Sequence, residues 1–190
     1  MAVFSRRQTP PRPVTLYLAY RPLVRDDFRE CCAYCLLHED WAAGQENFEL
    51  DHFRPKSLPQ FADLETDFYN LYYACHPCNH TKSNAWPDFS LEASGYGFLD
   101  FCADGFSHHF QEEANGSWTP LSRRAQYTVE RLRLNRRHLV QIRSLLREIA
   151  AERGVQAVDW NLPAGEQIRE LVAGPNRRGV IVNVPFSLRP

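Results

Sequence analysis

The sequence has no apolar run that approaches the length of a membrane-spanning helix. Residues 1–13 hold three arginines but no apolar segment of the kind found in a secretory signal. These two absences predict a cytoplasmic protein with no membrane association. The chain also has no internal repeat and no clear linker, so its 190 residues predict one domain with terminal extensions.

Neither positive nor negative charge is in clear excess, since the net charge is −1, but the charges are unevenly distributed along the chain. Residues 1–29 carry a balance of +4, residues 39–113 one of −11 and residues 121–153 one of +6. Basic flanks around an acidic centre are typical of a protein that binds phosphates at its edges and a metal in the middle. Solvated faces of arginine-rich helices produce the same pattern, so charge alone leaves both interpretations open.

Four of the six cysteines form two Cys-x-x-Cys pairs, Cys32/Cys35 and Cys75/Cys78. In a reducing compartment this spacing favours metal ligation over disulfides. Zinc takes four ligands in a tetrahedron, and thiolates at positions i and i+3 can occupy one side of it. The two pairs therefore predict a closed, structural Zn²⁺ site.

Other residues near these pairs leave alternatives. Cys31 in place of Cys32 would give a Cys-x-x-x-Cys spacing, which zinc also accepts, although Cys32 is preferred. Cys31 and Cys102 are otherwise expected to be small buried residues. The spare candidate ligands are His38, His76 and His80.

Between the cysteine pairs, the pattern predicts two strands, then a helix. Residues 48–52 alternate apolar and polar side chains, and residues 70–75 are rich in aromatics, so each segment is expected to be a strand. Residues 53–68 are expected to form the loop between them. Residues 79–84 are expected to form the first turns of a helix, with Asn79 at its start.

The remainder of the chain is predicted more coarsely. The expected elements are an extended arm over residues 1–14, a helix over 23–31, irregular or β structure over 95–120, a helix from Ser122, a second helix capped by Asn135 and ended by Gly154, and a strand over 180–184.

Several side chains near the cysteine pairs suit the hydrolysis of a phosphodiester, which needs a base to activate water and a divalent metal to stabilise charge. Asp51 offers an oxygen ligand for Mg²⁺, and His52 has the pKa range of a general base. Asn79 offers a second ligand, and Lys82 is placed to touch the phosphate. Asn70 is expected to pin the loop that joins the two strands.

Each of these residues taken alone also has an ordinary structural interpretation, such as a turn residue, an N-cap or a solvated lysine. Asp51 and His52 are neighbours on a predicted strand and would point to opposite faces. Both can serve one site only if the strand breaks after them, and Arg54-Pro55 makes such a break plausible. The order of the motif residues relative to the two cysteine pairs favours a hydrolytic site over these structural interpretations.

The ordered motifs resemble the HNH endonuclease family over residues 29–90. They are Leu50-Asp51-His52-x-x-Pro55-x-Ser57, Asn70-Leu71 and Cys75-x-x-Cys78-Asn79-x-x-Lys82. The preceding Cys32-x-x-Cys35 is similar to the zinc-stabilised branch of that family. The resemblance implies an α+β fold with a ββα-metal core and a Cys₄ zinc site, and metal-dependent cleavage of nucleic acid.

The resemblance also implies a role for each matched residue. His52 would be the general base, Asp51 and Asn79 would hold a catalytic Mg²⁺ or Mn²⁺, and Asn70 would stabilise the loop and orient the base. The segment after Pro55 lacks the glycines often found there, which affects the shape of the loop. His80 stands beside Asn79, so either one remains a candidate for the last ligand.

The matched segment divides the chain into an N-terminal arm (1–28), a nuclease core (29–90) and a helical extension with a C-terminal tail packed on the core (91–190). Residues 131–140 are similar to a helical extension of small bacterial HNH proteins, some of which act beside an ATPase in anti-phage defence. The arginines expected to hold the DNA backbone, together with Lys82, are Arg123, Arg124, Arg131, Arg136 and Arg137.

The sequence thus favours a metal-dependent DNA endonuclease in bacterial defence. The alternatives are a non-catalytic zinc module that binds nucleic acid or protein, and a nuclease that is latent until a partner ATPase activates it. The near-neutral isoelectric point favours the latent form. DNA versus RNA, one strand versus two, and oligomeric state stay open.

Overall fold

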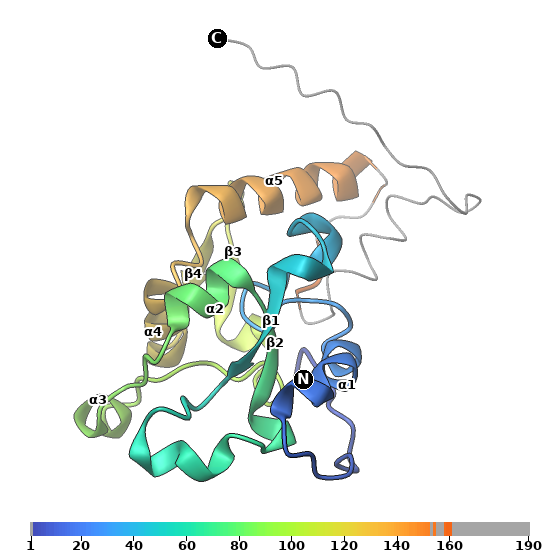
Figure 1. Cartoon of the computed structure of the whole chain (residues 1–190). Helices are drawn as coiled ribbons and strands as arrows, with labels where there is room; N and C mark the ends of the chain where they lie inside the picture. The colour runs from blue at the N-terminus through green and yellow to red at the C-terminus, as the bar shows by residue number, and fades with distance from the viewer. Residues whose placement is uncertain (1, 153, 155–157, 161–190) are drawn as a thin grey trace.

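The centre of the protein is a two-stranded antiparallel sheet followed by a short helix (Figure 1). In this computed structural model, which describes residues 2–152, 154 and 158–160, the strands are β1 (Phe48–His52) and β2 (Leu71–Cys75). The helix is α2 (His76–Lys82). The predicted α+β class and the strand–loop–strand–helix order are therefore confirmed.

The start of α2 differs from the prediction. The helix begins at His76, within the second cysteine pair, because Pro77 in its first turn has a backbone angle that suits a helix start. Asn79 therefore lies in the interior of α2 and does not open it.

The register of the sheet brings the two strands together over their full lengths. His52 at the end of β1 pairs with Leu71 at the start of β2, and Leu50 pairs with Tyr73. The intervening loop contains two 3₁₀ turns, Pro59–Leu64 and Phe68–Asn70. The loop therefore leaves the sheet directly after His52 and returns to it directly after Asn70.

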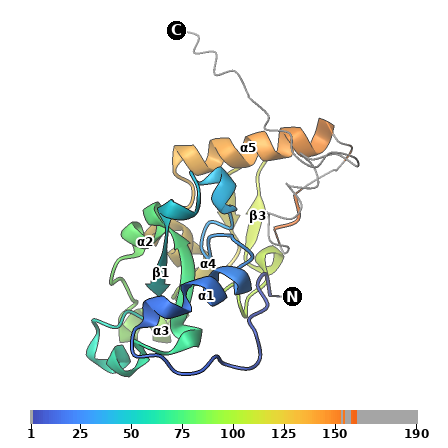
Figure 2. The same ribbon diagram turned by 45° about the vertical axis from the view of Figure 1, so that its right-hand side comes forward.

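A second hairpin and two longer helices complete the described structure (Figures 1 and 2). The helix α5 lies across one end of the molecule, and the loop of residues 53–68 lies at the other. The remaining elements are α1 (Arg21–Asp27), α3 (Phe89–Ala93), β3 (Phe110–Glu112), β4 (Trp118–Pro120), α4 (Arg123–Arg131), α5 (Arg137–Glu152) and 3₁₀ turns at Tyr17–Tyr20, Glu39–Trp41, Gln45–Asn47 and Phe106–His108.

Three expectations about these elements need correction or lie outside the described residues. The first helix ends at Asp27, earlier than expected, because Arg29 and Glu30 have left-handed backbone angles that stop it. The helix α3 was not foreseen. The strand expected over residues 180–184 lies outside the described residues.

Asn135 does not cap a helix. Its side-chain amide instead accepts a hydrogen bond from the Trp118 N–H (2.8 Å) and donates one to the Trp118 carbonyl (2.8 Å). The residue therefore completes the free edge of β4. The turn between β3 and β4 lies tight against α5, because a Cβ on Gly116 would come within 2.6 Å of the Val140 carbonyl oxygen.

The first residues of the chain, which the sequence predicts to be an extended arm, pack onto the core. Val3 and Phe4 are buried, and both donate backbone hydrogen bonds to the Phe101 carbonyl (2.9 and 3.0 Å). Arg6 and Arg7, which belong to the basic N-terminal flank, both bind the Asp27 carboxylate. One hydrophobic core links these residues with the sheet and both long helices.

Every helix in the described ranges is too short or too polar to cross a membrane.

We expect Asp27→Asn to destabilise the fold by about 3 kcal/mol, because it leaves the buried Arg6 guanidinium without a counter-charge. The free energy of unfolding in urea measures this loss. Asp26→Asn is the matched control: Asp26 pairs with Arg7 at an exposed position, so its loss should cost about 0–1 kcal/mol. Equal effects of the two substitutions would contradict the buried role of Asp27.

Candidate active site

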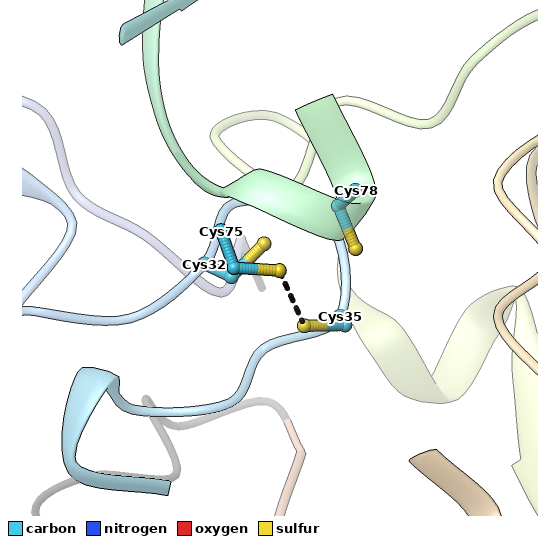
Figure 3. Close-up of side chains that lie close together, drawn as sticks. All are labelled: Cys32, Cys35, Cys75 and Cys78. Atoms are coloured by element: carbon cyan, nitrogen blue, oxygen red, sulfur yellow. Dashed lines mark hydrogen bonds between the residues drawn. The ribbon is translucent and has the colours of Figure 1, made fainter. Parts of the chain in front are cut away.

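The four paired cysteines converge at the junction of the first cysteine loop with β2 and α2 (Figure 3). All four are buried, and their sulfurs lie within 4.8 Å of one another. Cys35 and Cys75 are 3.8 Å apart, which matches the edge of a tetrahedron with Zn–S bonds of about 2.3 Å. The cluster is thus able to hold a zinc ion, with Cys32 as its member and Cys31 outside it.

The cluster is closed, and one of its sulfurs already has a cationic neighbour. Arg136 donates a hydrogen bond to the Cys78 sulfur at 3.4 Å. A Zn²⁺ ion with four thiolates carries a net negative charge, so a guanidinium at this distance stabilises it. Arg136, which was expected to hold DNA, is therefore engaged with the cysteine cluster instead.

A separate cleft of about 310 Å³ lies beside the sheet, on the side where α2 packs. Most of the residues that the motifs singled out line it. The lining residues are Glu49, Leu50, Asp51, His52, Pro55, Lys56, His76, Asn79, His80, Ser83 and Asn84. Asp51 and His52 thus reach one site although they are neighbours, because β1 ends at His52 and Pro55 turns the chain.

His52 is held in one tautomer by the main chain. Its Nε2 lies 2.8 Å from the Glu65 carbonyl oxygen, which can only accept, so Nε2 carries the hydrogen and Nδ1 has the free lone pair. The ring also contacts the edge of Tyr17, with centroids 4.7 Å apart. Burial lowers the pKa of His52 below its usual value, against the opposing effect of the Glu65 carbonyl. The side chain is therefore a neutral base at neutral pH.

Asn70 ties the two ends of the loop together and lies behind the cleft. Its Oδ1 accepts from the Arg54 N–H (2.9 Å), and its Nδ2 donates to the Arg54 carbonyl (3.0 Å) and to the Leu64 carbonyl (3.3 Å). Its own carbonyl accepts from the Phe53 N–H (2.9 Å). The residue therefore fixes the main chain immediately after His52.

Asp51 is buried beneath the cleft, where Tyr34 and Lys82 contact it. The Tyr34 hydroxyl donates to its Oδ2, and the Lys82 ammonium lies 2.9 Å from the same oxygen. Burial raises the pKa of Asp51, and the two partners oppose that rise. Since both contacts use Oδ2, Oδ1 is the oxygen that remains to hold a cation.

Lys82 was expected to touch a phosphate, and the structure places it elsewhere. The side chain is completely buried, and its ammonium donates to the His52 carbonyl (2.8 Å) in addition to its contact with Asp51. Burial lowers the pKa of Lys82, while Asp51 opposes the change. The lysine is thus a buried support for both motif residues and has no access to a ligand in the cleft.

Asn79 and His80 both line the cleft, in different environments. Asn79 is half-buried and donates through Nδ2 to Glu49, so its Oδ1 is not used by that contact. His80 is exposed, and its ring stacks on His76 at 5.9 Å. Glu49 also binds His76 at 2.7 Å.

Glu49 and Tyr34 are site residues that the motif reasoning missed. Alternation along β1 places Glu49 on the same face as Asp51, so its place in the cleft was readable from the strand pattern. Although burial acts to raise it, contacts with His76 and Asn79 hold the pKa of Glu49 below its usual value. Tyr34 lies inside the first cysteine pair, where no local pattern indicates its contact with Asp51.

The five expected DNA-binding arginines lie in different environments. Arg131 and Arg137 are exposed, while Arg124 binds Asp104 and the Phe98 carbonyl. Arg123 donates to the Ser94 carbonyl and is otherwise exposed.

Comparison with known families agrees with this site. Residues 32–85 match the family model described as HNH endonuclease, and this segment contains both cysteine pairs, β1, β2 and α2. The resemblance to the HNH family is therefore confirmed for this segment. An HNH domain indicates, in general terms, that the function is of the nuclease type. A search of curated proteins finds no match to the chain.

We expect the purified protein to contain one zinc ion per chain, and its removal by a chelator to unfold the core. Binding to such sites supplies about 10 kcal/mol or more, which is comparable to the whole stability of a domain. Metal analysis and circular dichroism before and after chelation measure both effects. Cys78→Ser should lose the ion and Cys102→Ser should keep it; a metal-free protein with an intact fold would contradict the assignment.

Proposed function

We propose that this protein is a metal-dependent endonuclease that hydrolyses phosphodiester bonds in DNA. The observation that carries the proposal is the fixed tautomer of His52, which leaves Nδ1 as the basic nitrogen of a side chain that lines one cleft with Asp51 and Asn79. This is the arrangement that general-base hydrolysis needs. The division into an N-terminal segment (1–28), a catalytic unit (29–90) and an extension (91–190) is part of the same proposal.

In this mechanism His52 removes a proton from a water molecule through Nδ1, and the Glu65 carbonyl stabilises the resulting imidazolium through the hydrogen bond to Nε2. Asp51 and Asn79 would supply oxygen ligands for a Mg²⁺ or Mn²⁺ ion, and His80 would supply a nitrogen ligand if it replaced Asn79. Such an ion, when bound, stabilises the charge on the phosphate and on the leaving oxygen. Asn70 keeps the main chain beside His52 in place.

A second groove supports DNA as the substrate. It has a volume of about 620 Å³ and shares His80, Ser83 and Asn84 with the cleft. Arg131 and Arg133 also line it, and both are exposed. A nucleic acid strand whose scissile phosphate lies in the cleft would place neighbouring phosphates near these two guanidinium groups.

The cellular setting that we propose rests on a sequence similarity. The similarity of residues 131–140 to extensions of small bacterial HNH proteins supports a role in anti-phage defence, in the cytoplasm, beside a partner ATPase. A nuclease that depends on such a partner would be latent alone. A cleavage assay therefore includes a second condition, in which a candidate partner ATPase is added.

We expect the wild-type protein to nick a supercoiled plasmid with Mg²⁺ or Mn²⁺, and His52→Ala to reduce the single-turnover rate by about 100-fold or more, because the base is lost. Gel analysis of nicked and linear products measures the rate. His108→Ala is the matched control, since this histidine is exposed and does not line the cleft. Equal rates for wild type and His52→Ala would reject His52 as the base.

We also expect the cleavage rate to rise with pH and to level off by neutral pH. His52 acts as a base only when neutral, and its pKa lies below the ordinary value of 6.5 because the ring is buried. The rate is therefore lost as pH falls through this lowered pKa. A pH profile at saturating metal measures the midpoint, and a midpoint well above 6.5 would contradict the burial of a neutral base.

A further inference from the structure

Arg6 is a buried arginine in the segment before α1, far from the motif residues in sequence. Its side chain is 9 % exposed, and its Nε lies 3.0 Å from Asp27. The guanidinium carbon lies 5.0 Å from the centroid of the Phe28 ring and 4.7 Å from that of Phe68. A buried ion pair contributes little net stability compared with apolar packing, so its geometry is the more informative property.

The other two nitrogens of Arg6 both bind main-chain carbonyls beside Asn70. Nη1 donates to the Leu71 carbonyl at 3.1 Å, and Nη2 donates to the Phe68 carbonyl at 2.9 Å. One of these residues follows Asn70 and the other precedes it by two positions. The planar fork of a guanidinium can bridge two carbonyls in this way, and a lysine ammonium cannot reproduce that geometry.

Asn70 transmits this constraint to the main chain that follows His52. Its side chain accepts a hydrogen bond from the Arg54 N–H and donates one to the Arg54 carbonyl, and its own carbonyl accepts from the Phe53 N–H. Asn70 also donates to the Leu64 carbonyl, next to the Glu65 carbonyl that fixes the His52 tautomer. A displacement of Asn70 would therefore alter the support of His52 from two sides.

We propose that Arg6 is a positioning residue, which holds the main chain on both sides of Asn70 and thereby fixes the orientation and tautomer of His52. Its catalytic consequence rests on the proposed nuclease function. Arg6 does not line the cleft, so it acts through Asn70 and makes no contact with substrate. Arg6 thus supports the cleft from outside the matched family segment.

The test compares Arg6→Gln and Arg6→Lys with Arg7→Gln in the full chain. Arg7 also binds Asp27, at 2.7 Å, but its side chain donates to neither the Phe68 nor the Leu71 carbonyl, so it controls for the loss of the ion pair. Arg6→Lys keeps the positive charge, so it still tests the role of the guanidinium if the glutamine variant fails to fold. Zinc content and circular dichroism establish that each variant is folded.

In the kinetic arm, we expect both Arg6 variants to lower kcat, by about 10- to 100-fold, with KM unchanged, because a small misplacement of the base impairs the chemical step and not binding. Arg7→Gln should keep the wild-type kcat. If kcat in the two Arg6 variants were the same as in Arg7→Gln, the proposal would be overturned. Absence of cleavage by the wild-type protein, alone or with its partner, would instead count against the proposed function.

In the second arm, which needs no activity, amide exchange and histidine NMR measure the constraint itself. We expect the Arg6 variants to speed exchange of the Phe53 and Arg54 amides and to replace the single Nε2–H form of His52 by a mixture of tautomers. The Trp118 amide, in the distant hairpin, should exchange at its wild-type rate. Uniformly faster exchange across the protein, or an unchanged His52 tautomer, would reduce Arg6 to a stabilising residue and overturn the inference.

Discussion

The arrangement of the cleft depends on β2 being held at both of its ends. At one end, Cys75 joins the cysteine cluster, which ties the strand to the first cysteine loop and to α2. At the other end, Arg6 binds the Leu71 carbonyl. Because β1 is paired with β2 along its full length, these two anchors also place Asp51 and His52. A two-stranded sheet has little core of its own and needs such anchors.

The motif residues Asp51, His52 and Lys82 are all buried. Asp51 and Lys82 form a buried ion pair under the cleft, and His52 is almost covered. Burial lowers the pKa of His52, the hydrogen bond to the Glu65 carbonyl fixes its tautomer, and Lys82 offsets the rise in the pKa of Asp51. The cleft thus places a neutral imidazole next to a carboxylate that a buried cation helps to keep ionised.

Local sequence patterns predicted the part of the structure that depends on short-range spacing. Alternation located β1, aromatic enrichment located β2, and the two Cys-x-x-Cys pairs located the cluster. The expected loop-pinning role of Asn70 agrees with its contacts to Arg54.

Partners that are distant in sequence were not predictable in this way. The sequence predicts a phosphate contact for Lys82, because spacing does not reveal that it faces Asp51, a residue on another element. It predicts a DNA contact for Arg136, because nothing near it in sequence indicates the Cys78 sulfur. It places Arg6 in an extended arm for the same reason. In each case the sequence predicts an accessible arginine or lysine, whereas in the fold its side chain binds an acceptor that is distant in sequence.

We propose that the protein has two distinct metal sites, a closed one at the cysteines and an open one in the cleft. Anomalous diffraction from a crystal soaked in Mn²⁺, recorded at the zinc and manganese edges, tests it directly. We predict zinc at the four cysteines and manganese between Asp51 and Asn79. Manganese absent from the cleft at saturating concentration, or bound only by Glu49 and the histidines on α2, would contradict the account.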